Sequence, residues 1–478
     1  MLRLALILGL LSAVGPFAID MYLPALPTLA SDFDATEAAV QLTLTSYFLA
    51  FGVAQLFYGP MADAVGRKPP LLLGLAIFAL GSAGAVFADS ITSLAGWRFV
   101  QGLGGASLMV VPRAVIRDRY TGTDATRLMA MIMLVISVSP MLAPLAGSGV
   151  IAVAGWRTIF AVLLVAAGLS VLLLIFGLEE TLPAAARQRP RLRPLLLGAK
   201  RLLGDPIFMA LTFVGGFGMA SFFVFIASAS FVYTQQFGLT PTGFSIAFAI
   251  NAVGFFGASQ IAAPLGARFG IQRVVRIGVT GFAVVTLFMS GIAVAGWTSL
   301  TVVVVGLVIA NAFLGVVIPT TMVLALEDHG DIAGLASSLG GTLQMLAGGV
   351  MITAAGPFFD GTVTPMLLAI ALCGVLAASL CWAVRALRQD APPQPRAGLA
   401  REEPEHMPRH LPQLATRRNM GVDIGQHRMH HRNRIAVLSG AKNPPVRLRE
   451  DPRRIVIGRA PHHHPVKAGI EKPLNLDE

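Results

Sequence analysis

The stretch IGVTGFAVVTLFMSGIAVAGWTSLTVVVVGLVIANAFLGVVIPTTMVLAL (residues 277–326) contains no Asp, Glu, Lys or Arg. It is long enough to cross a membrane twice, because a helix needs roughly 20 apolar residues to span the hydrocarbon core. Residues 206–267 form a second charge-free run. Both runs are continuously apolar and lack the two-residue alternation of membrane barrel strands. They therefore predict pairs of membrane-spanning helices.

Composition extends this interpretation to most of the chain. Of the 478 residues, 55% are apolar and 13% are charged, whereas about a quarter of the residues in a soluble protein are charged. Apolar segments of spanning length lie at about residues 4–30, 40–62, 70–88, 93–115, 128–151, 157–178, 206–232, 242–265, 274–295, 298–325, 333–357 and 363–385. The fold class expected is all-α integral membrane, with twelve transmembrane helices in two six-helix bundles. The first segment could instead be a cleaved signal peptide, but its basic region is weak and no good cleavage site follows.

Basic residues gather in alternate loops, which places those loops in the cytoplasm. The loops carry Arg67, Lys68, Arg117, Arg119, Arg127, Arg187, Arg189, Arg191, Arg193, Lys200, Arg201, Arg268, Arg273 and Arg276. The loop with Glu327, Asp328 and Asp331 lacks Lys and Arg and departs from the pattern. Both termini are expected to be cytoplasmic.

The longest internal loop divides the spans into six and six. This predicts an N-terminal bundle (1–180), a cytoplasmic linker (181–205), a C-terminal bundle (206–387) and a basic, disordered cytoplasmic tail (388–478). Repeated halves are typical of secondary transporters, and a weak echo supports them. Pro60 and Gly66 follow the second span with the same spacing as Pro264 and Gly270 after the eighth.

The tail carries most of the net charge of +11 and eight of the nine histidines. The basic balance therefore gives no reason to expect nucleic acid as a partner. No carboxylate or cysteine cluster completes a metal site around the tail histidines, so no metal is expected. Cys373 and Cys381 lie in one apolar run, which excludes a disulfide framework.

Enzyme motifs are missing from the sequence. There is no Gly-x-x-x-x-Gly-Lys-Ser/Thr phosphate loop and no His-Glu-x-x-His. The chain is therefore expected not to be an enzyme and to need no cofactor.

Two ionisable residues lie deep within predicted spans, where such groups are functional candidates. Asp20 lies roughly 24 Å from the inner face along a helix, and Arg98 roughly 7–8 Å below the outer face. Both therefore lie in the outer half of the membrane, where they could meet or share a water-filled cavity. The alternative is that Asp20 caps a helix end and Arg98 extends outward to the headgroups.

The turn after the second span reads Gly59-Pro-Met-Ala-Asp63-Ala-Val-Gly66-Arg67-Lys68. We expect the glycines to allow close helix approach and a sharp bend, and Arg67 and Lys68 to anchor the turn at the headgroups. A carboxylate at a helix C-terminus opposes the helix dipole, so Asp63 needs a partner. Arg113 or Arg117, at the inner end of the fourth span, is predicted to supply it.

Polar side chains within the apolar spans are candidates to line a substrate cavity, although each could equally bond a neighbouring helix. The candidates chosen are Tyr47, Gln101, Asn251, Asn311 and Gln344.

The turn motif is similar to the loop signature Gly-x-x-x-Asp-x-x-Gly-Arg-Lys of the major facilitator superfamily. Arg98-Phe-Val-Gln-Gly-Leu-Gly104 resembles the span-four motif of that superfamily, whose arginine is associated with proton coupling. Asp20-Met-Tyr-Leu-Pro24-Ala-Leu-Pro27, Phe248-Ala-Ile-Asn251 and Glu180-Thr-Leu look like the Bcr/CflA drug-resistance subfamily. The resemblance covers about residues 4–387 and implies a proton-driven drug exporter of the bacterial inner membrane. Such an exporter needs a deep group that exchanges its proton, so Asp20 is the predicted proton carrier and Arg98 its coupling partner.

The span-five motif departs from the antiporter pattern Gly-x-x-x-Gly-Pro-x-x-Gly-Gly. Here Ser139-Pro-Met-Leu-Ala143-Pro144-Leu-Ala-Gly147-Ser148 keeps Pro144 and Gly147, and each replacement is small. Close packing and a kink are therefore still expected. Together with Gly59, Asp63, Gly66, Arg67, Lys68, Arg113 and Arg117, these two residues form the predicted conformational switch.

The function expected is proton-coupled multidrug efflux, by alternating access, of small drugs such as bicyclomycin or phenicols. The partners are a small-molecule drug, protons and the lipid bilayer, and the chain is expected to be a monomer. An uptake symporter for a metabolite is the alternative within this fold. A receptor or scaffold that transports nothing would explain neither Asp20 nor Arg98.

Overall fold

The computed structural model describes residues 2–187 and 192–390. The first half of the described chain forms α1 (Leu2–Asp20), η1 (Leu23–Ala25), α2 (Leu26–Asp32), α3 (Glu37–Val65), α4 (Lys68–Val86), α5 (Ile91–Arg119), α6 (Gly122–Ala154) and α7 (Arg157–Gly177). The connection to the second half contains η2 (Ala184–Ala186) and α8 (Leu192–Leu203). The second half forms α9 (Pro206–Phe231), the π-helical segment η3 (Val232–Gln236), α10 (Pro241–Phe269), α11 (Ile271–Val294), α12 (Leu300–Glu327), η4 (Gly330–Ile332), α13 (Ala333–Ala355), η5 (Gly356–Phe358) and α14 (Val363–Asp390).

Twelve helical segments of the described chain are long and apolar enough to cross a membrane. No strand occurs in residues 2–187 or 192–390. The prediction of an all-helical protein with twelve spanning helices is confirmed. Large apolar side chains such as Val165, Phe176 and Phe288 are exposed on the outside of the helices, as lipid contact requires.

The helices begin and end at residues whose chemistry favours those positions. Ser and Thr hydroxyls and the Asp205 carboxylate cap N-termini; Asp205 accepts from the N–H groups of Ile207 and Phe208 at 2.8 and 3.1 Å. Gly66 and Gly270 end α3 and α10 with φ of +102° and +83°, a conformation that side chains rarely adopt. The two echoed glycines therefore occupy equivalent chain reversals.

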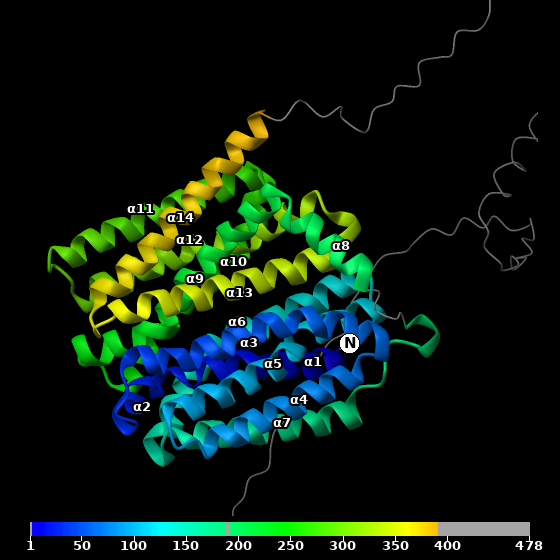
Figure 1. Cartoon of the computed structure of the whole chain (residues 1–478), viewed down its shortest axis with the longest axis horizontal. Coiled ribbons are helices and arrows are strands. Elements are labelled where there is room, and N and C mark those ends of the chain that lie inside the picture. Colours follow the sequence, from blue (N-terminus) through cyan, green and yellow to red (C-terminus); the bar gives the residue numbers. More distant parts are fainter. Residues whose placement is uncertain (1, 188–191, 391–478) are drawn as a thin grey trace, which may run out of the picture. The chain divides into compact units, whose positions relative to one another are not determined.

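Most helix contacts lie within α1–α7 or within α9–α14, and Figure 1 shows these groups in the lower and upper parts of the view. The main contacts between them are α3 with α13 and α6 with α10. Thr342 on α13 donates to the Gly52 carbonyl on α3 at 2.7 Å, and the Ser148 and Ser245 hydroxyls on α6 and α10 lie 2.6 Å apart. The residue boundaries of the two predicted bundles remain a prediction.

The first span differs from the continuous helix expected. The α-helix stops at Asp20 and resumes at Leu26 after the short η1. Pro24 and Pro27 cause the break, because proline cannot donate the backbone hydrogen bond that would continue α1. Asp20 therefore lies at a helix end inside the span Arg3–Asp32.

The predicted linker contains a helix that the sequence analysis did not anticipate. Helix α8 packs against both α13 and α9, with Leu202 fully buried and Gly198 against Leu335. Its 12 residues are too few to span a membrane, so a search for spanning segments overlooked it. The predicted disordered tail lies outside the described residues beyond Asp390.

Candidate functional site

Arg98 lies in a closed aromatic site on α5. Its side chain has no exposed surface, and its Cζ lies 4.8 Å from the Tyr22 ring centroid and 4.5 Å from that of Tyr47. Phe160 of α7 forms a third, more distant wall at 5.9 Å. A cation held against aromatic faces is stabilised by the ring quadrupoles. Arg98 is therefore held inside the protein, and the alternative that it extends outward to the headgroups is wrong.

Hydrogen bonds fix the orientation of the Arg98 guanidinium. Nη1 donates to the Ala18 carbonyl at 2.9 Å and to the Gln101 side-chain oxygen. Gln101 in turn donates to Ser82 at 2.8 Å. Among the described residues, Nε and Nη2 of Arg98 have no hydrogen-bond partner. The guanidinium thus retains unused donors beside α1, enough for a carboxylate.

Asp20 follows Ala18 by two residues and ends α1. Its side chain is 4% exposed. In residues 2–187 and 192–390 no hydrogen bond or ion pair involves its carboxylate. The predicted meeting of Asp20 and Arg98 is therefore not made in this conformation, although Arg98 bonds the backbone next to Asp20.

Helix α6 closes the other side of this helix break. A Cβ added to Gly147 would lie 2.1 Å from the Met21 carbonyl oxygen, so α6 and the residue after Asp20 are in direct contact. One turn earlier, the Pro144 carbonyl accepts from the Ser148 and Ser245 hydroxyls at 2.9 Å each. The span-five segment therefore links the Asp20 break to α10. Close packing occurs at Gly147 as expected; the switch roles of Pro144 and Gly147 remain predictions.

The predicted cavity residues lie in three separate places. Tyr47 and Gln101 surround Arg98, and the Tyr47 hydroxyl donates to Gly15 at 3.4 Å. In the second half, Asn311 on α12 donates to the Asn251 side chain on α10 at 3.3 Å, and Asn251 donates to Ala247 at 3.0 Å. Each of these four residues bonds or contacts a neighbour, so their roles as substrate contacts remain predictions.

The third place is occupied by Gln344 on α13, whose Nε2 is buried without a hydrogen-bond partner among the described residues. A Cβ on Gly215 of α9 would lie 2.7 Å from that nitrogen. The amide therefore has an unused donor inside the second half, as a substrate contact would need.

The α9–α10 region is rich in stacked phenylalanines. Phe225 stacks on Phe248 with centroids 5.6 Å apart, and Phe222 on Phe255 at 5.2 Å. Phe223 of α9 stacks on Phe48 of α3 at 4.0 Å and so joins the two halves. These rings make an apolar, aromatic centre beside the Asn251–Asn311 pair.

The α3–α4 turn shows that the predicted partner of Asp63 is wrong. Asp63 pairs with Arg67, four residues later, at 2.5 Å. Arg67 also donates to both oxygens of Asp118 on α5, at 2.7 and 3.0 Å. The positive φ of Gly66 reverses the chain, so that Arg67 reaches back over the end of α3. Span four does supply a partner to this turn, but the partner is the acid Asp118.

Neither Arg113 nor Arg117 makes an ion pair in the described chain, although Arg117 is close enough to Asp118 to interact with it electrostatically. Arg113 is half-buried, and its Nε has no hydrogen-bond partner in the described chain, while Arg117 is exposed. A Cβ on Gly59 would meet no atom within 4 Å, so the expectation of close helix approach at Gly59 is also wrong.

Glu180, after α7, fastens the start of α4. It accepts from the backbone N–H of Arg67 at 2.8 Å and of Lys68 at 3.1 Å. Partial burial opposes its charge, but the backbone donors of Arg67, Leu182 and Lys68 outweigh that effect and lower the pKa of Glu180. The Asp118 and Asp63 carboxylates, despite some desolvation, raise the pKa of Arg67. The turn is thus a network of ionised groups that joins α3, α4, α5 and the end of α7.

Sequence reasoning missed several residues of these sites. Tyr22, whose hydroxyl lies 2.8 Å from the Thr43 hydroxyl, had a signal, because it lies two residues after Asp20. Asp118 had one too, as an acid amid Arg117 and Arg119. Phe160 had none, since it is one phenylalanine among 28.

Comparisons with known proteins agree on the class of this chain. The family model described as Major Facilitator Superfamily matches residues 8–352. Uncharacterized MFS-type transporter YdgK of Bacillus subtilis is 34% identical, over 76% of this chain and 91% of its own length. Bicyclomycin resistance protein homolog of Haemophilus influenzae is 31% identical, over 78% and 93%, and Multidrug resistance protein D of Escherichia coli is 32% identical, over 82% and 98%.

A solved structure shares the fold. The xylose transporter XylE of Escherichia coli, in a partially occluded inward open conformation, aligns with a TM-score of 0.63. The alignment covers 80% of this chain and 97% of XylE, at 14% sequence identity.

Proposed function

Because the chain belongs to the major facilitator superfamily, we propose that it is a proton-coupled multidrug efflux antiporter. It is a multi-pass bacterial membrane protein and a transporter rather than an enzyme. Its relatives include drug-resistance transporters. We place it in the inner membrane with both termini in the cytoplasm, acting as a monomer that exports small bicyclomycin-like or phenicol-like drugs.

One observation carries the proposal of proton coupling. A fully buried arginine is bonded to the backbone two residues before a buried aspartate, and the two side chains are not paired. Buried ionisable residues in membrane spans are costly and mark ion or proton pathways. Arg98 and Asp20 are therefore the proposed coupling pair.

The position of Asp20 suggests how coupling works. It ends α1 at a break whose next residues contact α6, α9 and α10. When the two halves rock in alternating access, the surroundings of this break change. Arg98 has free donors that can take up the Asp20 carboxylate in one state, which releases the proton, and leave it in the other. The proton gradient would then drive export without a cofactor.

We propose that the drug binds between the halves, near the stacked phenylalanines of α9 and α10. Ligand pockets are mostly apolar with a few polar groups, and Asn251, Asn311 and Gln344 provide these in the second half. Tyr47 and Gln101 provide them on the Arg98 side. Coupling would follow if the drug and the proton alter the same contacts across α6 and α10.

Transport by the reconstituted full chain under an imposed proton gradient tests the proposal. Wild type should concentrate drug against its gradient and release protons in exchange, while Asp20→Asn should do neither. Asp34→Asn is the matched control, because Asp34 is exposed and its φ of +48° suits asparagine. An Asp20→Asn protein that still pumps drug uphill would refute the assignment.

The direction of substrate movement relative to the protons decides between export and uptake. A metabolite symporter would move its substrate in the direction of the protons, whereas an antiporter moves it against them. In cells, drug accumulation that rises when the protein is expressed and falls when a protonophore is added would favour the symporter.

A further inference from the structure

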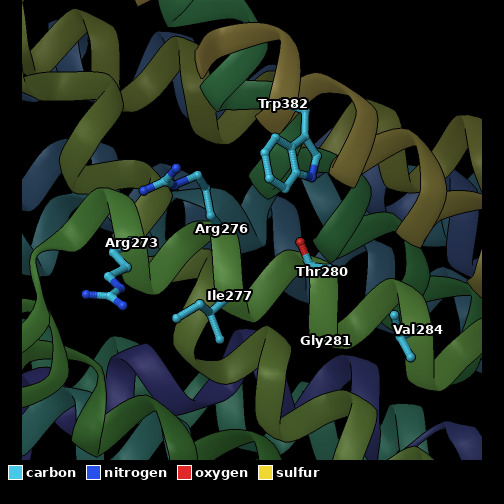
Figure 2. A pocket seen from close by; sticks show the side chains of 7 residues that line it. All are labelled: Arg273, Arg276, Ile277, Thr280, Gly281, Val284 and Trp382. Carbon is cyan, nitrogen blue, oxygen red and sulfur yellow. The ribbon is translucent and has the colours of Figure 1, made fainter. Parts of the chain in front are cut away.

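A groove of about 570 Å³ lies on the surface of the helix bundle, between α11 and α14. It is lined by Arg273, Arg276, Ile277, Thr280, Gly281, Val284 and Trp382. Figure 2 shows the two arginines at one end of the groove, Val284 toward the other, and Trp382 on the facing helix. None of its lining residues belongs to the sites described above.

We propose that this groove binds an anionic phospholipid. The first argument is its place in the membrane. Arg273 and Arg276 lie in the first two turns of the span Ile271–Val294, and Trp382 in the last turns of Val363–Ala386. Arginine and tryptophan at span ends lie at the level of lipid headgroups. The groove therefore opens to lipid at the membrane surface.

The second argument is the order in which charged, polar and apolar side chains follow one another along α11. Residues 273, 276, 280 and 284 recur on one face of the helix, and in this order they are two cations, a hydroxyl and an apolar side chain. Thr280 lies roughly 6 Å deeper than Arg276 along the helix axis. A phospholipid presents a phosphate, ester oxygens and an acyl chain in the same order. The face thus matches a lipid that stands upright in the bilayer.

The third argument is that the arginines at the groove have no acidic partner among the described residues. Among the described residues, no ion pair involves Arg273, Arg276 or Arg385. The Arg385 Cζ lies 5.3 Å from the Trp382 ring centroid, which brings a third cation to the groove. A cluster of unpaired cations between transmembrane helices favours an anionic headgroup over a zwitterionic one.

The apolar end of the groove has room for a chain. Ile277 is 59% exposed, Val284 60% and Trp382 48%, so these side chains line the groove without filling it. Below them, a Cβ on Gly374 of α14 would lie 3.2 Å from the Ala283 Cα of α11. Helices α11 and α14 therefore pack closely at Gly374.

Native mass spectrometry of the purified full chain tests the proposal, with dioleoyl phosphatidylglycerol or dioleoyl phosphatidylcholine added at equal concentration. Each cation next to an anionic headgroup is worth roughly a fivefold change in affinity, whereas a cation outside the groove does not contact the bound lipid. Wild type should therefore retain phosphatidylglycerol at least roughly fivefold better. Arg273→Gln with Arg276→Gln should reduce this retention roughly 25-fold at most, whereas replacement of both by Lys should keep most of it.

Arg268→Gln is the control, because Arg268 is an exposed cation near the same membrane surface but stacks on Phe269 outside the groove. It should leave retention unchanged. Brominated phosphatidylglycerol should quench a fluorescence component that disappears in Trp382→Phe. Equal retention of the two lipids, an equal loss in Arg268→Gln, or displacement by free glycerophosphate would overturn the proposal. The wild-type lipid comparison needs no variant, so a variant that fails to fold leaves the test intact.

Discussion

The two halves of the molecule differ in what they bury. Asp20, Arg67 and Arg98, the buried Asp and Arg side chains of the described chain, all belong to α1–α5 or the turn between α3 and α4. Helices α9–α14 bury amides, hydroxyls and stacked phenylalanines instead. The buried His329 of the second half lies outside these helices, in the loop after α12, where it is 3.2 Å from Asp205 at the start of α9. Proton exchange needs ionisable groups, and recognition of varied drugs needs apolar surface with few polar groups. The difference suggests that the first half handles the proton and that the second half sets drug affinity.

The α3–α4 and α10–α11 turns, which follow the second spanning helix of each half, repeat this contrast. The α3–α4 turn is held by Asp63, Arg67, Asp118 and Glu180. The corresponding α10–α11 turn shares the positive-φ glycine, but Arg268 there stacks on Phe269 at 5.2 Å. The repeat has preserved the backbone reversal and not the charges. Of these two equivalent turns, only the α3–α4 turn is held by ion pairs among the described residues, while the Arg201–Asp331 and His329–Asp205 pairs lie elsewhere, around the start of α9 and η4.

Loss of Arg98 should have the largest effect. Arg98→Ala removes a cation from three aromatic rings and leaves Ala18 and Gln101 without its hydrogen bonds. We expect uphill transport to fall to background in proteoliposomes, while drug binding in detergent persists. Arg98→Lys should retain part of the activity, because an ammonium also binds aromatic faces. Full activity in Arg98→Ala would break the assignment of coupling to the first half.

Gly147→Ala should be nearly as severe. The added methyl would lie 2.1 Å from the Met21 carbonyl oxygen, and both atoms belong to the backbone framework, so α6 must move away from the Asp20 break. Overpacking of this kind costs about 1–3 kcal/mol. Gly149→Ala is the matched control, since its Cβ would meet no atom within 4 Å. Transport and thermal stability should both fall only in Gly147→Ala.

The acids of the α3–α4 turn should rank by burial. The Asp118 side chain is 15% exposed and receives two Arg67 N–H groups, whereas that of Asp63 is 60% exposed. Charged hydrogen bonds are worth about 1.5–3 kcal/mol, and exposed ion pairs about 0.2–1 kcal/mol. Asp118→Asn should therefore slow transport more than Asp63→Asn, with equilibrium drug binding near wild type in both. Lost binding in either folded variant would place the turn in the drug site.

Variants of the amide pair should have the smallest effect. Asn251→Ala removes one hydrogen bond to Asn311, worth about 0.5–1.5 kcal/mol. The half-maximal drug concentration for transport should rise roughly 2–10-fold, and the pH dependence of transport should stay unchanged. A shifted pH profile in Asn251→Ala would show that the second half also takes part in proton coupling.

The sequence was sufficient for the spanning helices because hydrophobic length determines them residue by residue. It also singled out Asp20, Arg98, Asn251 and Asn311, since polar groups within apolar runs are conspicuous, but it did not predict that Asn251 and Asn311 are hydrogen-bonded to each other. It missed α8, whose 12 residues are too few to span a membrane and pack against α13 and α9. It also missed Asp118 as the partner of Arg67, because that pairing depends on a chain reversal at Gly66 and on the crossing of α3 and α5. Contacts between helices depend on rotation about each helix axis, which hydrophobicity does not specify.

Proton release on drug binding is the most direct test of the division between the halves. Drug is added to purified protein in lightly buffered detergent, and the pH change is recorded together with binding. Wild type and Asn251→Ala at saturating drug should release protons in equal amount, and Asp20→Asn should bind drug and release none. Proton release that survives in Asp20→Asn, or disappears in Asn251→Ala with drug still bound, would contradict the account.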